Sequence, residues 1–167
     1  MKISERINLF NSIRDLPFCI MGKKAAYCFS KSKQLKNGLE SIGIKSRMMQ
    51  GWFKWSDLNI PEKIKTLIVA DRQKHVFLEV YIPEKNRWVY VDPTWDIYLK
   101  SIFPIAQWDG INEANLMTKL TGVSEYKKAS ILHRTINKVK RKLHFKNNDN
   151  FYRALDRWID EIRSENL

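Results

Sequence analysis

Two adjacent strands joined by a short turn form the feature that most constrains how this chain folds. Residues 75–92 read HVFLEVYIPEKNRWVYVD, with His75 on the first strand and Asp92 closing the second. Proline, glutamate, lysine and asparagine at 83–86 supply the turn. Because neighbouring antiparallel strands lie about 5 Å apart, this hairpin can hold a carboxylate against an imidazole.

Helical patterns precede the hairpin. Apolar residues in three-residue steps predict a helix over 4–14, with Ser4 as its N-cap. A second helix is expected over 26–42, because one of its faces is apolar and lysines are available for the other. Gly43 stands where such a helix would end.

The remaining patterns predict an α+β protein with an antiparallel sheet and helices at both ends. Strand-like segments at 45–55 and 66–69 come before the hairpin. Residues 94–121 are expected to wrap the core irregularly through Trp95, Phe103 and Trp108. Two amphipathic helices are expected to finish the chain, one within 127–146 and one over 151–162.

Length and composition limit the class of protein. A chain of 167 residues fits one domain, 1–167, that can bury a core without disulfide bonds. No apolar run reaches the length of about 18 residues that a membrane span needs, and the first residues lack an apolar signal core. These features predict a cytoplasmic protein that does not span a membrane.

Cys28 supplies the third part of a nucleophilic site. It lies near the start of the helix expected over 26–42, and a helix N-terminus and an imidazolium both stabilise a thiolate. Asp92 would orient His75 by accepting a hydrogen bond from its second ring nitrogen. The residue types and their order therefore predict Cys28, His75 and Asp92 as catalytic residues.

Each of these residues also has a structural explanation. A free cysteine is often a small core residue, a lone histidine is usually a surface or satisfied core group, and an aspartate before proline is ordinarily a turn residue. Cys19 and Cys28 are too few for a disulfide framework and lack zinc-site spacing, although they could pair under oxidation. We expect no metal and no cofactor.

The motifs around these residues resemble those of the transglutaminase-like superfamily. Cys28 opens a helix that is followed by Gly-Ile-Lys-Ser-Arg at 43–47. His75 precedes the Leu-Glu-Val-Tyr stretch at 78–81, and Trp-Val-Tyr-Val-Asp-Pro-Thr at 88–94 completes the pattern. Trp95-Asp96 and Trp108-Asp109-Gly110 are also similar to motifs of an uncharacterised bacterial branch of this superfamily.

The resemblance covers about residues 12–95 and implies a papain-like core. In such a core, a helix carrying the nucleophile packs on an antiparallel sheet carrying the histidine and the aspartate. The resemblance implies that Cys28 is the nucleophile, that His75 is the general base and acid, and that Asp92 orients the imidazole. Residues 96–167 would form a C-terminal wrap and a helical extension.

The chain departs from the family pattern at the oxyanion donors, because family members usually carry glycine one or two residues before the cysteine. This chain has Ala26 and Tyr27 there. The backbone N–H of Cys28 is expected to be one donor. Tyr27 or a group near Trp52 is the candidate for the second donor and for part of the substrate groove.

The predicted function is acyl transfer from an amide of a protein or peptide through a thioester. Hydrolysis, by a protease, amidase or deamidase, is favoured over cross-linking because water is always present. The alternative is an inactive binding module of the same fold. Residues 127–146 hold eight Lys and Arg and no Asp or Glu, so this segment could contact an anionic partner such as nucleic acid or simply be a solvated helix face.

Overall fold

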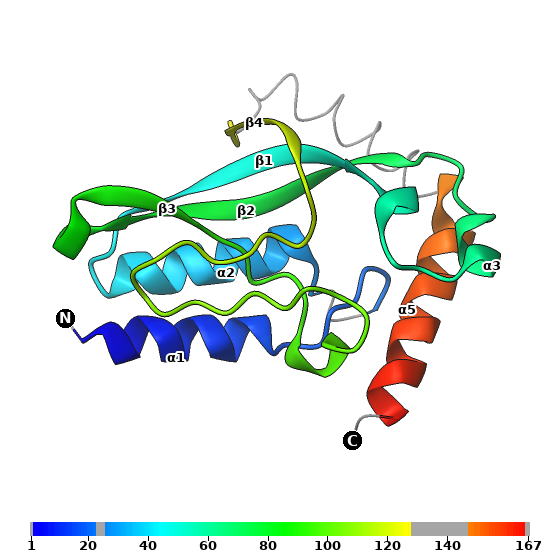
Figure 1. Cartoon of the computed structure of the whole chain (residues 1–167), viewed down its shortest axis with the longest axis horizontal. Helices are drawn as coiled ribbons and strands as arrows, with labels where there is room; N and C mark the ends of the chain where they lie inside the picture. The colour runs from blue at the N-terminus through cyan, green and yellow to red at the C-terminus, as the bar shows by residue number, and fades with distance from the viewer. Residues whose placement is uncertain (1, 23–25, 128–146, 166–167) are drawn as a thin grey trace.

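The computed structural model describes residues 2–22, 26–127 and 147–165. In these residues the chain is an α+β protein built on one curled antiparallel sheet of four strands, ordered β3-β2-β1-β4 (Figure 1). The strands are β1 (Ser46–Lys54), β2 (Arg72–Ile82), β3 (Arg87–Val91) and β4 (Thr121–Glu125).

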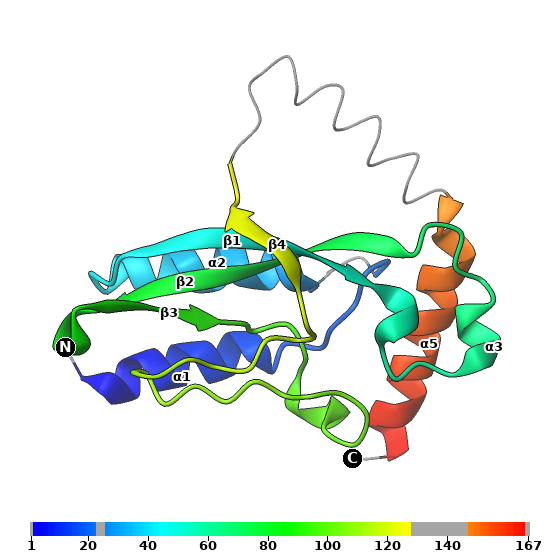
Figure 2. The same ribbon diagram turned by 45° about the horizontal axis from the view of Figure 1, so that its top comes forward.

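The helices form two groups around the sheet. α1 (Ile3–Arg14) and α2 (Cys28–Ser41) lie in successive layers on one side of the sheet, with α2 next to the strands (Figure 1). α3 (Glu62–Lys65) and α5 (Asp149–Glu165) stand together beyond one end of β1 and β2 (Figure 2). α2 begins at the end of the molecule nearer to α5.

Two apolar clusters hold these layers together. The first joins Leu35 and Leu39 of α2 to Leu78 and Val80 of β2, and α1 closes it from below. The second lies between the long connection after β3 and α5. Its members include Phe18, Trp95, Phe103, Met117, Phe151, Leu155 and Ile159. Removing this apolar surface from water favours the folded chain by about 25 cal/mol per Å².

Several sequence predictions are confirmed. The hairpin forms with Leu78 opposite Val91, and its turn closes through Asn86 at a left-handed φ of 47°. The helix expected over 26–42 ends before Gly43, whose φ of 78° is one that glycine adopts without strain. Trp95, Phe103 and Trp108 are all buried. The helix expected over 151–162 forms as α5, but its fully buried apolar residues are Phe151, Tyr152, Leu155 and Ile159, whereas Trp158 and Ile162 of the expected stripe are only partly buried.

Other predictions are wrong. Lys2, not Ser4, is the N-cap of α1, because the helix already begins at Ile3. The segment 66–69 is not a strand, since it forms turns after α3 and leaves Val69 largely exposed. The side-chain carbonyl of Asn148 accepts hydrogen bonds from the backbone N–H groups of Val69 and Ala70, both at 3.0 Å.

The C-terminal half contains a strand that the sequence patterns do not predict. β4 was not foreseen, because all five of its residues are exposed and it has no apolar alternation. It lies along β1 as an edge strand (Figure 2). The basic helix expected within 127–146 falls outside the described residues, apart from Lys127.

Candidate active site

Cys28 is the first residue of α2. The preceding residue, Tyr27, is the N-cap and has extended backbone angles, φ −110° and ψ 178°. The backbone N–H of Tyr27 donates to the Ser30 hydroxyl at 3.0 Å, which fixes the entry into the helix. The N–H groups of a first helical turn have no acceptor inside the helix, so the local field there favours negative charge.

The early end of β3 makes room for this helix terminus beside β2. β3 stops at Val91, opposite Leu78, and Pro93 follows shortly after. Val76 therefore lies beyond the end of β3 on β2. The Ser32 hydroxyl of α2 donates to the Val76 carbonyl at 3.1 Å, which attaches the start of α2 to the strand residue next to His75.

His75 and Asp92 form a buried pair. Nε2 of His75 lies 2.7 Å from Oδ2 of Asp92, and both side chains are excluded from solvent. Oδ1 of Asp92 accepts from the Thr94 N–H at 3.1 Å and from the Thr94 hydroxyl at 2.6 Å. Oδ2 also accepts from the Met117 N–H at 2.7 Å. The carboxylate is thus held from several directions.

The pair favours its charged state. Burial alone would lower the pKa of His75, but the charge and hydrogen bond of Asp92, together with the Cys28 thiol, raise this pKa to about 10. Burial likewise opposes the Asp92 carboxylate, yet His75 and the hydrogen bonds of Thr94 and Met117 hold the pKa of Asp92 below its usual value. At neutral pH the ring is an imidazolium.

The second ring nitrogen of His75 faces the thiol side of the site. Nδ1 is buried, and no described residue makes a well-directed hydrogen bond to it. The Cys28 thiol nevertheless interacts with the ring and contributes to its raised pKa. Because Asp92 occupies Nε2, Nδ1 is the nitrogen that remains for the sulfur of Cys28.

A cavity of about 610 Å³ lies against the thiol and the imidazole, but not against Asp92, and its volume is typical of small-molecule sites. Both Cys28 and His75 line it, as do Tyr27 and Trp52, whereas Trp108 packs in the core below the sheet. Aromatic side chains form a large part of the remaining wall. The other aromatic residues are Phe18, Phe29, Phe53, Trp55, Trp95, Tyr126 and Tyr152.

Tyr152 is a cavity residue that sequence reasoning missed. It comes from α5, far from the other site residues in the chain, and Gln73 donates to its hydroxyl at 3.3 Å. Burial raises the pKa of Tyr152, and the nearby Cys28 adds to the rise. The apolar periodicity expected over 151–162 does not include position 152, so no sequence signal indicated this tyrosine as a cavity residue.

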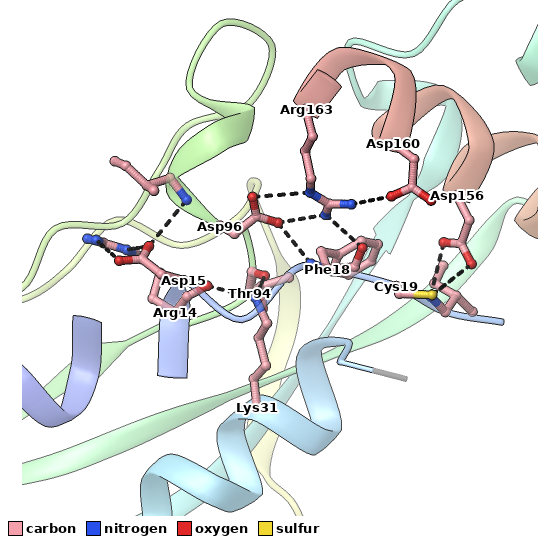
Figure 3. Close-up of polar contacts among 12 residues, drawn as sticks. Arg14, Asp15, Phe18, Cys19, Lys31, Thr94, Asp96, Asp156, Asp160 and Arg163 are labelled. Carbon is pink, nitrogen blue, oxygen red and sulfur yellow. Dashed lines mark hydrogen bonds and ion pairs between the residues drawn. The ribbon is translucent and has the colours of Figure 1, made fainter. Parts of the chain in front are cut away.

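A buried lysine supports the site from below. Lys31 lies one turn after Cys28 in α2, and its Nζ donates to the carbonyls of Arg14, at 2.8 Å, and Thr94, at 2.9 Å (Figure 3). Burial lowers the pKa of Lys31 to about 7. The same Thr94 binds Asp92, so Lys31 links α2 to the loop that holds the carboxylate.

A buried ion pair connects this loop to α5. Oδ2 of Asp96 accepts from Nη2 of Arg163 at 2.7 Å and from the Phe18 N–H at 2.8 Å (Figure 3). Arg163 also donates to the Phe18 carbonyl at 2.8 Å. The segment that leads to α2, the segment after β3 and the C-terminal helix therefore meet at one point.

Cys19 occupies a different environment from Cys28. Its thiol donates to Asp156 at 3.3 Å and accepts from the Gly22 N–H at 3.0 Å. Burial, followed by the Asp156 charge, raises the pKa of this thiol. Both cysteines are free, and Cys19 does not line the cavity that contains Cys28.

Comparison of the chain with models of known protein families, with characterised proteins and with solved structures finds no match. Within the described ranges, no group of three or more His, Cys, Asp and Glu side chains is placed to hold a metal ion. None of the helices described is long and apolar enough to cross a membrane.

Proposed function

We propose that this chain is a cysteine-nucleophile enzyme that hydrolyses an amide of a peptide or protein through a thioester intermediate. One observation carries the proposal: the Cys28 thiol interacts with the His75 ring where both line one cavity, and the buried Asp92 carboxylate binds the other nitrogen of that ring. The resemblance of their motifs to the transglutaminase-like superfamily supports the same assignment.

The first half-reaction forms the thioester. The Cys28 thiolate attacks the amide carbonyl carbon, and a tetrahedral oxyanion results. His75, protonated at neutral pH, then gives its proton to the amide nitrogen, the carbon–nitrogen bond breaks and the amine leaves. Asp92 keeps the ring oriented and stabilises its positive charge, as the acid does in related triads.

The second half-reaction releases the acyl group. Neutral His75 takes a proton from water as the water oxygen attacks the thioester carbonyl. The carbon–sulfur bond breaks, the acid product leaves, and Cys28 and His75 return to their starting state. An amine in place of water would give transamidation, but water is always present at high concentration, which favours hydrolysis.

The oxyanion needs hydrogen-bond donors that are fixed before the reaction. The Cys28 N–H belongs to the first turn of α2, where backbone N–H groups have no helical acceptor. Tyr27 and Trp52 line the cavity and stay candidates for the second donor. Tyr152, which also lines it, joins them because its hydroxyl is within electrostatic reach of Cys28.

Trapping the intermediate tests the proposal. Wild-type protein is mixed with a library of peptide amides, quenched in acid within seconds and analysed by intact and peptide mass spectrometry. We expect an acyl adduct on Cys28 that hydroxylamine removes, and free acid products that accumulate with time. The Cys28→Ala variant should give neither, and a wild-type protein that forms neither adduct nor product contradicts the proposal.

A further inference from the structure

We infer that the cavity selects an acidic peptide, whose carboxylate side chains near the scissile amide meet a cationic wall formed by Arg72, Lys74 and Lys127. This inference rests on the proposed function and adds the class of its substrate. All three cations line the cavity that contains Cys28, and no aspartate or glutamate is among its lining residues.

Two of the cations are held in fixed positions. Lys74 is the cross-strand partner of Trp52 in the pairing of β1 with β2. The Arg72 guanidinium lies 4.6 Å and the Lys74 ammonium 5.0 Å from the centre of the Trp52 ring. Cation–π contacts of this kind orient a charge without cancelling it. Lys74 also donates to the side-chain carbonyl of Gln50 at 3.3 Å, a neutral acceptor.

The charges of these residues are not balanced within the described part of the chain. None of the three forms an ion pair with a described residue, whereas other cations, such as Arg47 with Glu79, do. All three side chains are exposed, so a carboxylate can reach them, and the attraction is strongest at low ionic strength. A carboxylate that enters the cavity therefore meets positive charge for which no described side chain competes.

The spacing of the cations fits an extended peptide. Arg72 and Lys74 are two residues apart on β2, and a strand rises about 3.3 Å per residue, so their backbone positions lie roughly 7 Å apart. Alternate side chains of an extended peptide have the same spacing. A peptide with acidic residues at alternate positions can thus place one carboxylate at Arg72 and the next at Lys74.

A pair of thiol reagents tests this inference without a known substrate. Dithiobis(nitrobenzoate) and dithiodipyridine are both aromatic disulfides that a thiolate attacks to form a mixed disulfide and release one reagent thiolate. The first carries carboxylates and the second is neutral at pH 7.5. The ratio of their rates at Cys28 measures the preference for negative charge and corrects for any change in the reactivity of the sulfur.

The measurement uses a Cys19→Ser background at low ionic strength, with glutathione as the reference thiol. We expect the ratio at Cys28 to exceed that of glutathione and to fall about five-fold or more in Arg72→Gln/Lys74→Gln, because two nearby charges are removed. A charge-matched control, Lys63→Gln/Lys100→Gln, removes two exposed lysines outside the cavity. It should keep most of the wild-type ratio.

The outcomes separate this inference from the proposed function. Fast reaction with the neutral reagent but a ratio equal to that of glutathione, or an equal fall in both double variants, overturns the anionic preference alone. Slow reaction of Cys28 with both reagents contradicts the proposed function. A nucleic-acid oligomer that protects Cys28 better than an Asp-rich peptide would identify a different partner and also overturn the inference.

Discussion

Nε2 of His75 lies 2.7 Å from Oδ2 of Asp92, and neither side chain is open to solvent. A buried carboxylate with three further hydrogen bonds from Thr94 and Met117 cannot turn away from the ring. The pair therefore fixes both the orientation of the imidazole and the nitrogen that is left for Cys28.

Replacing Asp92 by asparagine should weaken the orientation and charge of the His75 ring while leaving the proposed nucleophile in place. The amide cannot balance the imidazolium charge, and its NH₂ group would face donors that now bind the carboxylate. We expect kcat/KM on a library-selected peptide to fall by about 10³- to 10⁴-fold, as in other triads. Cys28→Ala should abolish turnover, and a fully active Asp92→Asn enzyme would show that the carboxylate has no orienting role.

The buried charges of His75 and Lys31 should oppose each other as pH changes. The pKa of His75 rises from 6.5 to about 10 on folding, so the folded state holds the extra proton. The stabilisation by this group is full below pH 6.5 and is lost as pH rises to about 10. The pKa of Lys31 falls from 10.5 to about 7 on folding, so here the unfolded state holds the extra proton. The contribution of Lys31 to stability therefore rises as pH increases from about 7 to 10.5.

Two variants separate these effects. In urea unfolding between pH 6.5 and 10, Lys31→Met should lose stability relative to wild type as pH rises, because only the His75 effect remains. His75→Gln, which can still donate to Asp92, should gain stability relative to wild type over the same range. Differences from wild type that do not change with pH would contradict the assigned protonation states.

Arg163 should anchor α5 to the loop that follows β3. Arg163→Met leaves the fully buried Asp96 carboxylate without its ion-pair partner, and such losses cost about 3–5 kcal/mol. The matched control is Arg153→Gln, which breaks an exposed pair with Asp149 on the same helix and should cost about 1 kcal/mol or less. Equal free energies of unfolding for the two variants would show that the Asp96 contact is not structural.

Ser32 should attach the start of α2 to β2. Ser32→Ala leaves the Val76 carbonyl without its hydroxyl donor, and an unpaired buried carbonyl costs about 1–3 kcal/mol. The rate of Cys28 alkylation should fall at the same time, because the helix terminus is no longer fixed beside His75. Ser41→Ala, at an exposed hydroxyl near the other end of α2, serves as the control. It should alter neither quantity measurably.

The parts of the fold that depend on local sequence were predictable. The 75–92 hairpin is a contiguous segment whose turn residues set its register, so the approach of Asp92 to His75 follows from one stretch of chain. Apolar spacing and Gly43 likewise located α2. These elements are recognisable because their partners lie within a few residues or on the same periodic face.

The contacts that complete the site were not predictable from local patterns. Asp96 and Arg163 are 67 positions apart, and nothing in either neighbourhood indicates the other. Lys31 has the sequence context of a solvated lysine, yet its ammonium is buried against two carbonyls. The segment 66–69 resembles a strand in sequence, but Asn148 binds backbone N–H groups at its end and none of the described strands pairs with it.

The rate of alkylation of the two cysteines by iodoacetamide at pH 7 tests the central claim most directly. Cys28, beside an imidazolium and at a helix N-terminus, should react about a hundred-fold faster than Cys19, whose thiol pKa is raised by burial and Asp156. His75→Gln should remove most of this difference. Slow and equal labelling of both cysteines in the wild-type protein would contradict the account and favour a binding module without catalytic activity.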